Sequence, residues 1–253
     1  MLRTRILIAA LALLACSLPM RAQDDESRAL VLKAIQAAGG KETLAKYKAA
    51  QVKYKGEVDF MGMPAKVEGE VFVNYGDRMK NVIGVEINNM NLKISQGFDG
   101  KIGWMDVMGM VMELKDKELI DEMKESMHAE AVTNLAVLDS KDYKLSSLGQ
   151  MKVMGKEAVG VRVSKEGKRD VILWLDKKTH FVIKSEHRGK DPFNPASSEV
   201  NEEKYYDRYK AVQGVQTPQY MEVHHDGKKI VSLELTEARL HERPLEDSTF
   251  AKP

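Results

Sequence analysis

The chain has 253 residues, of which 43% are hydrophobic and 30% charged, and its formal net charge is +1 at pH 7. This balance is ordinary for a globular protein, and the length allows a sizeable core. The only cysteine, Cys16, lies near the N-terminus, which excludes a disulfide framework and thiol chemistry in the rest of the chain. No block of basic residues occurs, and this argues against nucleic acid as a partner.

Residues 1–22 are typical of an export signal peptide. Arg3 and Arg5 supply a positive start, and the apolar run that follows is too short to span a membrane. The end of this segment resembles a small-residue cleavage site, whereas the sequence before Cys16 resembles a lipoprotein box, so soluble export and a lipid anchor both stay open. We expect residues 23–253 to form one periplasmic domain, because no linker or shift in composition divides them.

The stretch from Met151 to Arg188 shows the pattern that most of the chain repeats. Three β-branched and aromatic runs are separated by turns too short to hold a crossover helix, which predicts antiparallel neighbours. The middle run, from Val171 to Leu175, is apolar on both faces, as expected of a central strand covered on both sides. Glycines inside other strand patterns, such as Gly56, Gly69 and Gly84, indicate points where the sheet bends.

Helical spacing interrupts this β pattern. It predicts one helix over Asp24–Ala38, a short one over Lys41–Lys48, and a third over Asp116–Leu138 with Asp116 as its N-cap. The polar face of the third helix is expected to hold Lys117, Asp121, Lys124, Glu125 and His128. The pattern predicts no further element at the C-terminal end, Asp247–Phe250. Together these patterns predict a mainly β (α+β) protein with a single strongly curved antiparallel sheet.

Four segments carry a resemblance to a known family. They are Gly97–Trp104 (Gly-Phe-Asp-Gly-Lys-Ile-Gly-Trp), Gly155–Val159, Leu173–Thr179 and Asp247–Phe250. With the helical insert between them, they resemble the LolA/LolB family of outer-membrane lipoprotein carriers, most closely its exported lipoprotein-sorting branch, over about residues 45–253. The resemblance implies an incomplete β-barrel of about 10–11 strands, helices across the concave side, and a hydrophobic cavity for acyl chains. It also implies partners in the inner and outer membranes of the envelope.

Methionine is the one residue type in excess, with 15 in the chain. Eight of these lie in three segments between residues 61 and 127. Methionine is unbranched and polarizable, and it is common where a surface fits varied apolar partners. We therefore predict an acyl-chain site lined by Phe60, Met63, Val71, Val73, Ile83, Val85, Ile94, Trp104, Met108, Met110, Met112, Leu119, Met123, Met127 and Trp174.

Two other interpretations of the methionines stay open. They can fill the solid core of an envelope interaction module, or their thioethers can bind copper(I) in a Met-rich periplasmic protein. On one strand, Met108, Met110 and Met112 would point the same way about 6–7 Å apart, too far for one ion unless the backbone is irregular.

Catalysis has little support in the sequence. His224-His225-Asp226 is the only histidine cluster, and neighbouring residues on a strand point to opposite faces, so the two imidazoles cannot readily share a metal. Common nucleophile, zinc, phosphate-loop and dithiol motifs do not occur. We predict a non-enzymatic carrier, without cofactor or metal, that binds a lipid or lipoprotein acyl chain as a chaperone for outer-membrane sorting.

The export prediction is checked by the mass of the protein recovered from an envelope fraction. We expect a mature chain that begins near Gln23. A chain that begins at an acylated Cys16 would replace soluble export by a lipid anchor and keep the carrier prediction. An intact Met1 terminus in the cytosol would contradict both.

Overall fold

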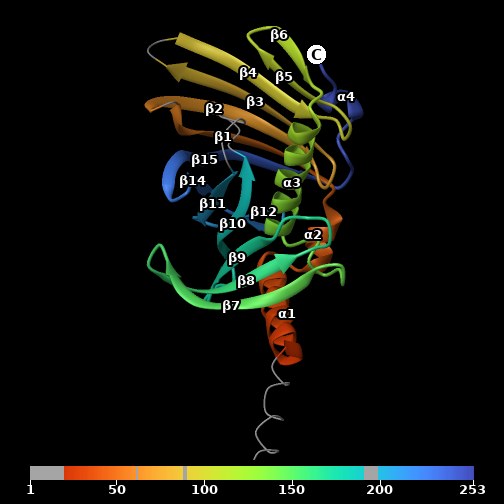
Figure 1. The fold of residues 1–253 in the computed structure, drawn as a ribbon, viewed down its shortest axis with the longest axis vertical. Coiled ribbons are helices and arrows are strands. Elements are labelled where there is room, and N and C mark those ends of the chain that lie inside the picture. The colour runs from red at the N-terminus through yellow and green to blue at the C-terminus, as the bar shows by residue number, and fades with distance from the viewer. Residues whose placement is uncertain (1–19, 61, 88–89, 191–198) are drawn as a thin grey trace, which may run out of the picture.

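The computed structural model describes residues 20–60, 62–87, 90–190 and 199–253. Its main feature is one antiparallel sheet of 13 strands in the order β6-β5-β4-β3-β2-β1-β15-β14-β11-β10-β9-β8-β7 (Figure 1). The strands of this sheet are β1 (Ala49–Phe60), β2 (Met63–Asn74), β3 (Arg78–Ile87), β4 (Met90–Phe98), β5 (Gly103–Val107), β6 (Met110–Leu114), β7 (Lys144–Val153), β8 (Lys156–Ser164), β9 (Val171–Asp176), β10 (Val182–Lys190), β11 (Glu199–Asp207), β14 (Tyr220–His225) and β15 (Lys228–His241).

Four helices and one small hairpin accompany the sheet. They are α1 (Met20–Ala37), α2 (Lys41–Lys46), α3 (Lys117–Thr133), α4 (Asp247–Phe250), and the pair β12 (Lys210–Val212) and β13 (Val215–Thr217). None of the helices in the described ranges combines the length and apolar character needed to cross a membrane.

α3 runs across the strands of the curved sheet, with β6–β2 toward one end of the helix and β9–β7 toward the other (Figure 1). We call the face under the helices the inner face. It carries Val161 and Leu173, which share one buried cluster with residues of α1 and α3. Side chains alternate along a strand, and paired residues of neighbouring strands share a face. The pairing register therefore identifies the inner-face residues of each strand from β9 to β6.

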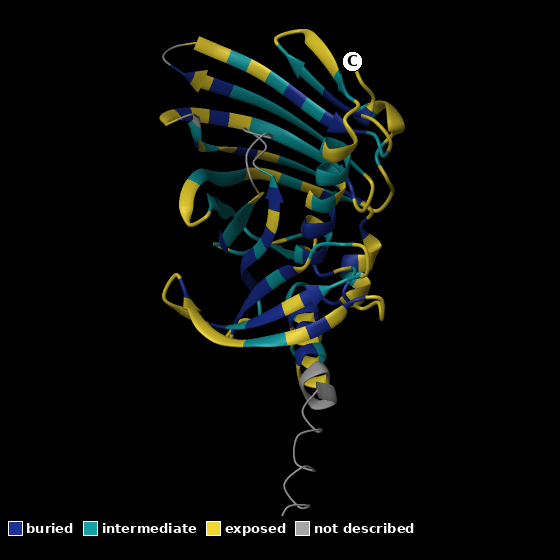
Figure 2. Cartoon of the chain, viewed as in Figure 1, coloured by how far each residue is buried: buried dark blue, intermediate teal, exposed yellow. Residues whose placement is uncertain are grey.

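Two buried clusters divide the inner face (Figure 2). The first, which we call the helix core, joins α1, α2 and α3 to strands β7–β11. The second joins the inner-face residues of β1–β4 and β15, such as Tyr54, Val67 and Val85. A third, smaller cluster around Trp174 and Ile183 lies on the outer face of β7–β10.

Both tryptophans lie on the outer face, each opposite a glycine of the neighbouring strand. Trp104 pairs with Gly97 and Trp174 with Gly160. A Cβ atom on Gly97 would lie 2.5 Å from the Trp104 ring, and one on Gly160 would lie 2.7 Å from the Trp174 ring. Only glycine leaves room for the aromatic ring at these positions. Trp104 Nε1 also donates a hydrogen bond of 2.8 Å to the carbonyl oxygen of Phe250, so α4 closes over it.

The predicted fold class is confirmed, with three corrections. The sheet is not closed, as predicted, but it has 13 strands rather than 10–11. The third helix begins after its predicted cap, Asp116, but ends at Thr133, after which Leu135 has a φ of 64°. The C-terminal residues, predicted to form no element, form α4, and the short hairpin β12–β13 was also not predicted.

The contact between Trp104 and α4 gives a stability prediction. Replacing Phe250 by Ala should lower the free energy of unfolding by about 3–5 kcal/mol, because Phe250 is fully buried and its loss leaves a cavity. Urea denaturation measures this. The exposed residues after it, 251–253, provide a control deletion that should change little. Equal losses for both variants would contradict a sealing role for Phe250.

Candidate functional site

The helices cover only one part of the inner face. α3 packs against β9 and β10, and α1 packs against β7. On β2–β4 the inner-face residues Val71, Ile83, Leu92 and Ile94 are only half-buried, whereas Val67 and Val85 are buried. The same face continues onto β5 and β6, where Met110 and Met112 are 67% and 50% exposed. We call the following residues the inner apolar surface: Val71, Ile83, Leu92, Ile94, Met105, Val107, Met110 and Met112.

One side of α3 faces this surface. Met123 reaches the β6 edge of the sheet. Its sulfur lies directly over Gly103, because a Cβ atom placed on Gly103 would be 2.9 Å from the Met123 sulfur and 3.2 Å from Leu114 Cβ. Leu119 and Ile120 are half-buried, while Met127 is buried. Apolar side chains of α3 therefore meet β5 and β6 near the edge of the sheet.

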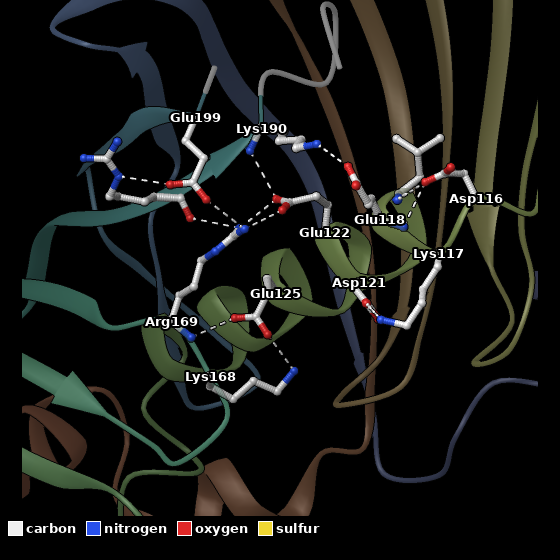
Figure 3. A network of polar contacts seen from close by, with 12 residues as sticks. Asp116, Lys117, Glu118, Asp121, Glu122, Glu125, Lys168, Arg169, Lys190 and Glu199 are labelled. Carbon is white, nitrogen blue, oxygen red and sulfur yellow. Dashed lines mark hydrogen bonds and ion pairs between the residues drawn. The ribbon is translucent and has the colours of Figure 1, made fainter. Parts of the chain in front are cut away.

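The other side of α3 is anchored by ion pairs, which Figure 3 shows. Arg169 donates to both carboxylate oxygens of Glu122, at 2.7 and 2.5 Å, and Lys168 donates to Glu125 at 2.9 Å. Lys190 donates to Glu118 at 2.7 Å. The hydrogen bond from Arg169 holds the pKa of Glu122 below its usual value.

These contacts correct the expected polar face of the helix. Glu125 lies against the sheet rather than in solvent, because Lys168 and the backbone N–H of Arg169 both donate to it. His128 is buried and stacks on Tyr143 with ring centroids 5.9 Å apart. Lys117 and Asp121 lie on the expected side and pair with each other.

A polar cluster interrupts the apolar inner face on β10, β11 and β14. Lys204 pairs with Glu130 of α3 and with Glu202, the latter at 3.2 Å. Glu202 also lies 3.3 Å from His225 Nε2 and 3.7 Å from His187 Nε2. We call these five residues the inner polar cluster.

Charge pairing controls the protonation of this cluster. Burial alone would lower the pKa of Lys204, but Glu130 and Glu202 hold its pKa well above the usual value. Burial alone would raise the pKa of Glu202, but Lys204 and the contact with His225 hold its pKa well below the usual value. Burial lowers the pKa of His187. Lys204 and Glu202 are therefore both charged at neutral pH.

The outer face carries a different kind of surface. Strands β1–β4, β14 and β15 line an open hollow of about 1260 Å³ there. Its side chains alternate in charge across the strands, as in the pairs Lys55–Glu68 and Glu57–Lys66. Such complementary pairs are typical of a solvated sheet face, and this surface does not suit an acyl chain.

The structure brings together part of the predicted site. Val71, Val73, Ile83, Val85 and Ile94 share the inner face with Met110 and Met112, and Met123 reaches this face from α3. Met63 is exposed at the start of β2, Leu119 is half-buried on α3, and Met127 is buried on α3. The side chain of Phe60 lies outside the described residues.

Three predicted residues do not share this surface. Trp104 and Trp174 point to the outer face, and Met108 has a φ of 53° in the turn before β6. The three methionines considered for copper are therefore not consecutive inward residues of one strand. Elsewhere in the described ranges, no three His, Cys, Asp or Glu side chains are placed to hold a metal ion.

The inner polar cluster, Leu92 and Val107 were not predicted, whereas Met105 belongs to the methionine segments noted in the sequence. Leu92 follows the same alternation as the predicted residues, so the pattern itself contained that signal. The charged cluster gave no such signal, because Glu202 and Lys204 lie in the run Glu-Glu-Lys, which is typical of a solvated strand.

The fold and the inner surface define a class of protein: an open, curved antiparallel sheet with helices across its inner face and an apolar surface that they leave half-covered. Three solved structures share this fold. They are a DUF1329 family protein from Desulfovibrio piger (TM-score 0.57, 14% identity, covering 90% of this chain and 97% of that one), a domain described as an outer membrane lipoprotein-sorting protein from Vibrio parahaemolyticus (0.53, 12%, 90% and 97%), and a LolA superfamily protein from Nitrosomonas europaea (0.53, 13%, 89% and 97%). No protein-family model and no curated protein matches the sequence. The structural resemblance to LolA-like proteins is confirmed at the level of the fold.

The buried histidines give a pH prediction. Burial lowers the pKa of His128 and His187 below 6.5, so the unfolded chain binds more protons, and stability should fall as the pH drops from about 7.5 to about 5.5. Carboxylates with lowered pKa, such as Glu202, add to this loss only below about pH 4.5. Urea denaturation at several pH values measures the slope.

The variant His128→Phe should reduce this slope. His128 Nε2 is buried without a hydrogen-bond partner, and phenylalanine keeps a ring against Tyr143. The pH dependence that remains in this variant should come from His187. An unchanged slope in His128→Phe would contradict this account.

Proposed function

We propose that this protein is an exported, non-enzymatic carrier that binds the acyl chain of a lipid or lipoprotein between α3 and the inner apolar surface. The observation that carries the proposal is the half-buried state of that surface beside α3. The names of the fold relatives, which include a lipoprotein-sorting domain and a LolA superfamily protein, support this choice. In the cell the partners would be envelope proteins that deliver and receive the cargo.

The energetics favour such a ligand. Each methylene group removed from water contributes about 0.8 kcal/mol, so a chain of 12 to 16 carbons supplies on the order of 10 kcal/mol before the costs of ordering and association. Methionine side chains at the β6 edge adapt to chains of different shape. Binding therefore requires no specific hydrogen bond along the chain.

A solid-core interaction module is the alternative. The helix core, with fully buried residues such as Val132, Leu138 and Leu173, fits that role equally well. The two functions differ in one respect, because only a carrier uses the inner apolar surface for a ligand. A substitution on that surface therefore discriminates between them.

The test compares two neighbouring residues of β3. Ile83 is half-buried on the inner face, and Val82 is half-buried on the outer face. Ile83→Asp should reduce the affinity for a fluorescent fatty-acid probe at least about tenfold, because an unpaired carboxylate on an apolar surface is costly. Val82→Asp is the matched control and should leave probe binding unchanged.

Thermal midpoints of both variants are measured with the binding. A parent protein that binds no probe would leave only the solid-core module. Equal losses of probe binding in both variants would show that binding does not depend on the inner face.

A further inference from the structure

The inner polar cluster lies on the same face of the sheet as the inner apolar surface, with β15 and β1 between them, and an acyl chain alone does not account for its charges. Lys204 pairs in register with Val223, which pairs with Val231, which pairs with Val58 of the second apolar cluster. Adjacent strands are about 4.8 Å apart, so the charged group lies within a few strand spacings of the proposed chain. On β10, β11 and β14, Lys204 is the only lysine or arginine in the described residues that points inward.

The partners of Lys204 differ in how easily they can be replaced. The Glu202 side chain is 18% exposed and is also held by His225. The Glu130 side chain is 50% exposed and comes from α3 rather than from the sheet. Glu130 also continues the helix stripe of Met123 and Met127, at spacings of four and three residues, so it points to the same side of α3 as the side chains proposed to contact the ligand.

We propose that Lys204 binds the anionic head group, a carboxylate or a phosphate, of the amphiphile whose chain lies on the inner apolar surface. In the empty protein Glu130 occupies this position with its own carboxylate. An entering anion replaces Glu130 at the Lys204 ammonium, and Glu130 turns to solvent. The inference rests on the proposed function, since it identifies the class of ligand that the same site would take.

The charge balance favours an anionic head group over a cationic one. Exchange of one carboxylate for another keeps Lys204 paired and leaves Glu202 in place. A cationic head group would have to compete with Lys204 for Glu130 and Glu202, and would leave a largely buried ammonium group without its partners, which is costly.

The experiment compares four ligands that share a 16-carbon chain: hexadecanoate, hexadecyl phosphate, hexadecanol and hexadecylamine. Affinities are measured at pH 7.5 by displacement of a fluorescent fatty-acid probe from the mature chain. We expect the two anions to bind at least about tenfold more tightly than the alcohol and the amine, since hydrogen bonds to a charged group contribute about that much.

Two variants should act in opposite directions. Lys204→Met should remove the preference for the anions and leave hexadecanol unchanged. Glu130→Gln should bind both anions several-fold more tightly, because it removes the competing carboxylate, and should also leave hexadecanol unchanged.

The chain provides a matched control for the loss of a buried lysine. Lys184, on the outer face of β10, is likewise held by two carboxylates, Glu186 at 3.1 Å and Glu203 at 2.5 Å. Lys184→Met should leave the ligand preference unchanged. If either lysine variant fails to fold, double variants that remove a lysine and one of its carboxylate partners together are used instead. These double variants are Lys204→Met/Glu202→Gln and Lys184→Met/Glu203→Gln.

The outcomes separate the two proposals. Hexadecanol bound as tightly as the anions, a preference for hexadecylamine, or weaker anion binding in Glu130→Gln would overturn the head-group assignment and leave the acyl-chain proposal standing. If none of the four ligands binds, the proposed function itself fails. A preference between carboxylate and phosphate identifies which kind of head group is carried.

Discussion

A continuous sheet of 13 strands has more inner surface than the helices of this protein cover. α1 and α3 bury much of the inner face of β7–β10, with residues such as Val161 and Leu173 removed from water. The inner face of β2–β6 also carries many apolar residues, and in the described structure several of them, such as Val71, Ile83 and Ile94, are only half-buried. Exposed apolar surface of this extent is unfavourable in water and is commonly functional. The proposed ligand would cover the part of the inner face that α1 and α3 leave half-buried.

α3 contacts the sheet by different interactions on its two sides. Glu122 and Glu125 attach it to the loop before β9 through side chains that are largely withdrawn from solvent. Pairs of this kind are screened less by salt than fully exposed ones. Glu118, which is exposed, pairs with Lys190 at the end of β10. Met123, in contrast, carries an apolar side chain that lies against Gly103 of β5. The directional bonds thus fix the helix over the helix core, while its side facing β6 meets an adaptable surface.

The sequence was sufficient for the fold class, because alternation and short turns leave few topologies other than an antiparallel meander. It was also sufficient for the inner aliphatic residues of β2–β4, where Val71, Ile83 and Ile94 follow a strict period of two. It failed for the tryptophans, because an isolated aromatic residue in a strand of five or six residues does not show which face is inward. The glycines opposite them, Gly97 and Gly160, carried a signal, but it becomes readable only when the register is known.

The inner polar cluster could not be predicted for a different reason. Charged residues on strands are usually solvated, and the run that contains Glu202 and Lys204 gives no local indication of burial. Burial arises only when β11 lies in the middle of the sheet and α3 places Glu130 above it.

The two buried lysines of neighbouring strands show why this cluster differs from an ordinary structural ion pair. Lys184 and its two glutamates all belong to the sheet, and together they form a closed polar group on its outer face. Lys204 joins the sheet to a helix through a half-exposed carboxylate, and it does so next to an apolar surface. Buried ion pairs contribute little net stability, since desolvation offsets most of the attraction. The proposed recognition of an anionic head group would account for a charged group kept on the inner face of such a sheet.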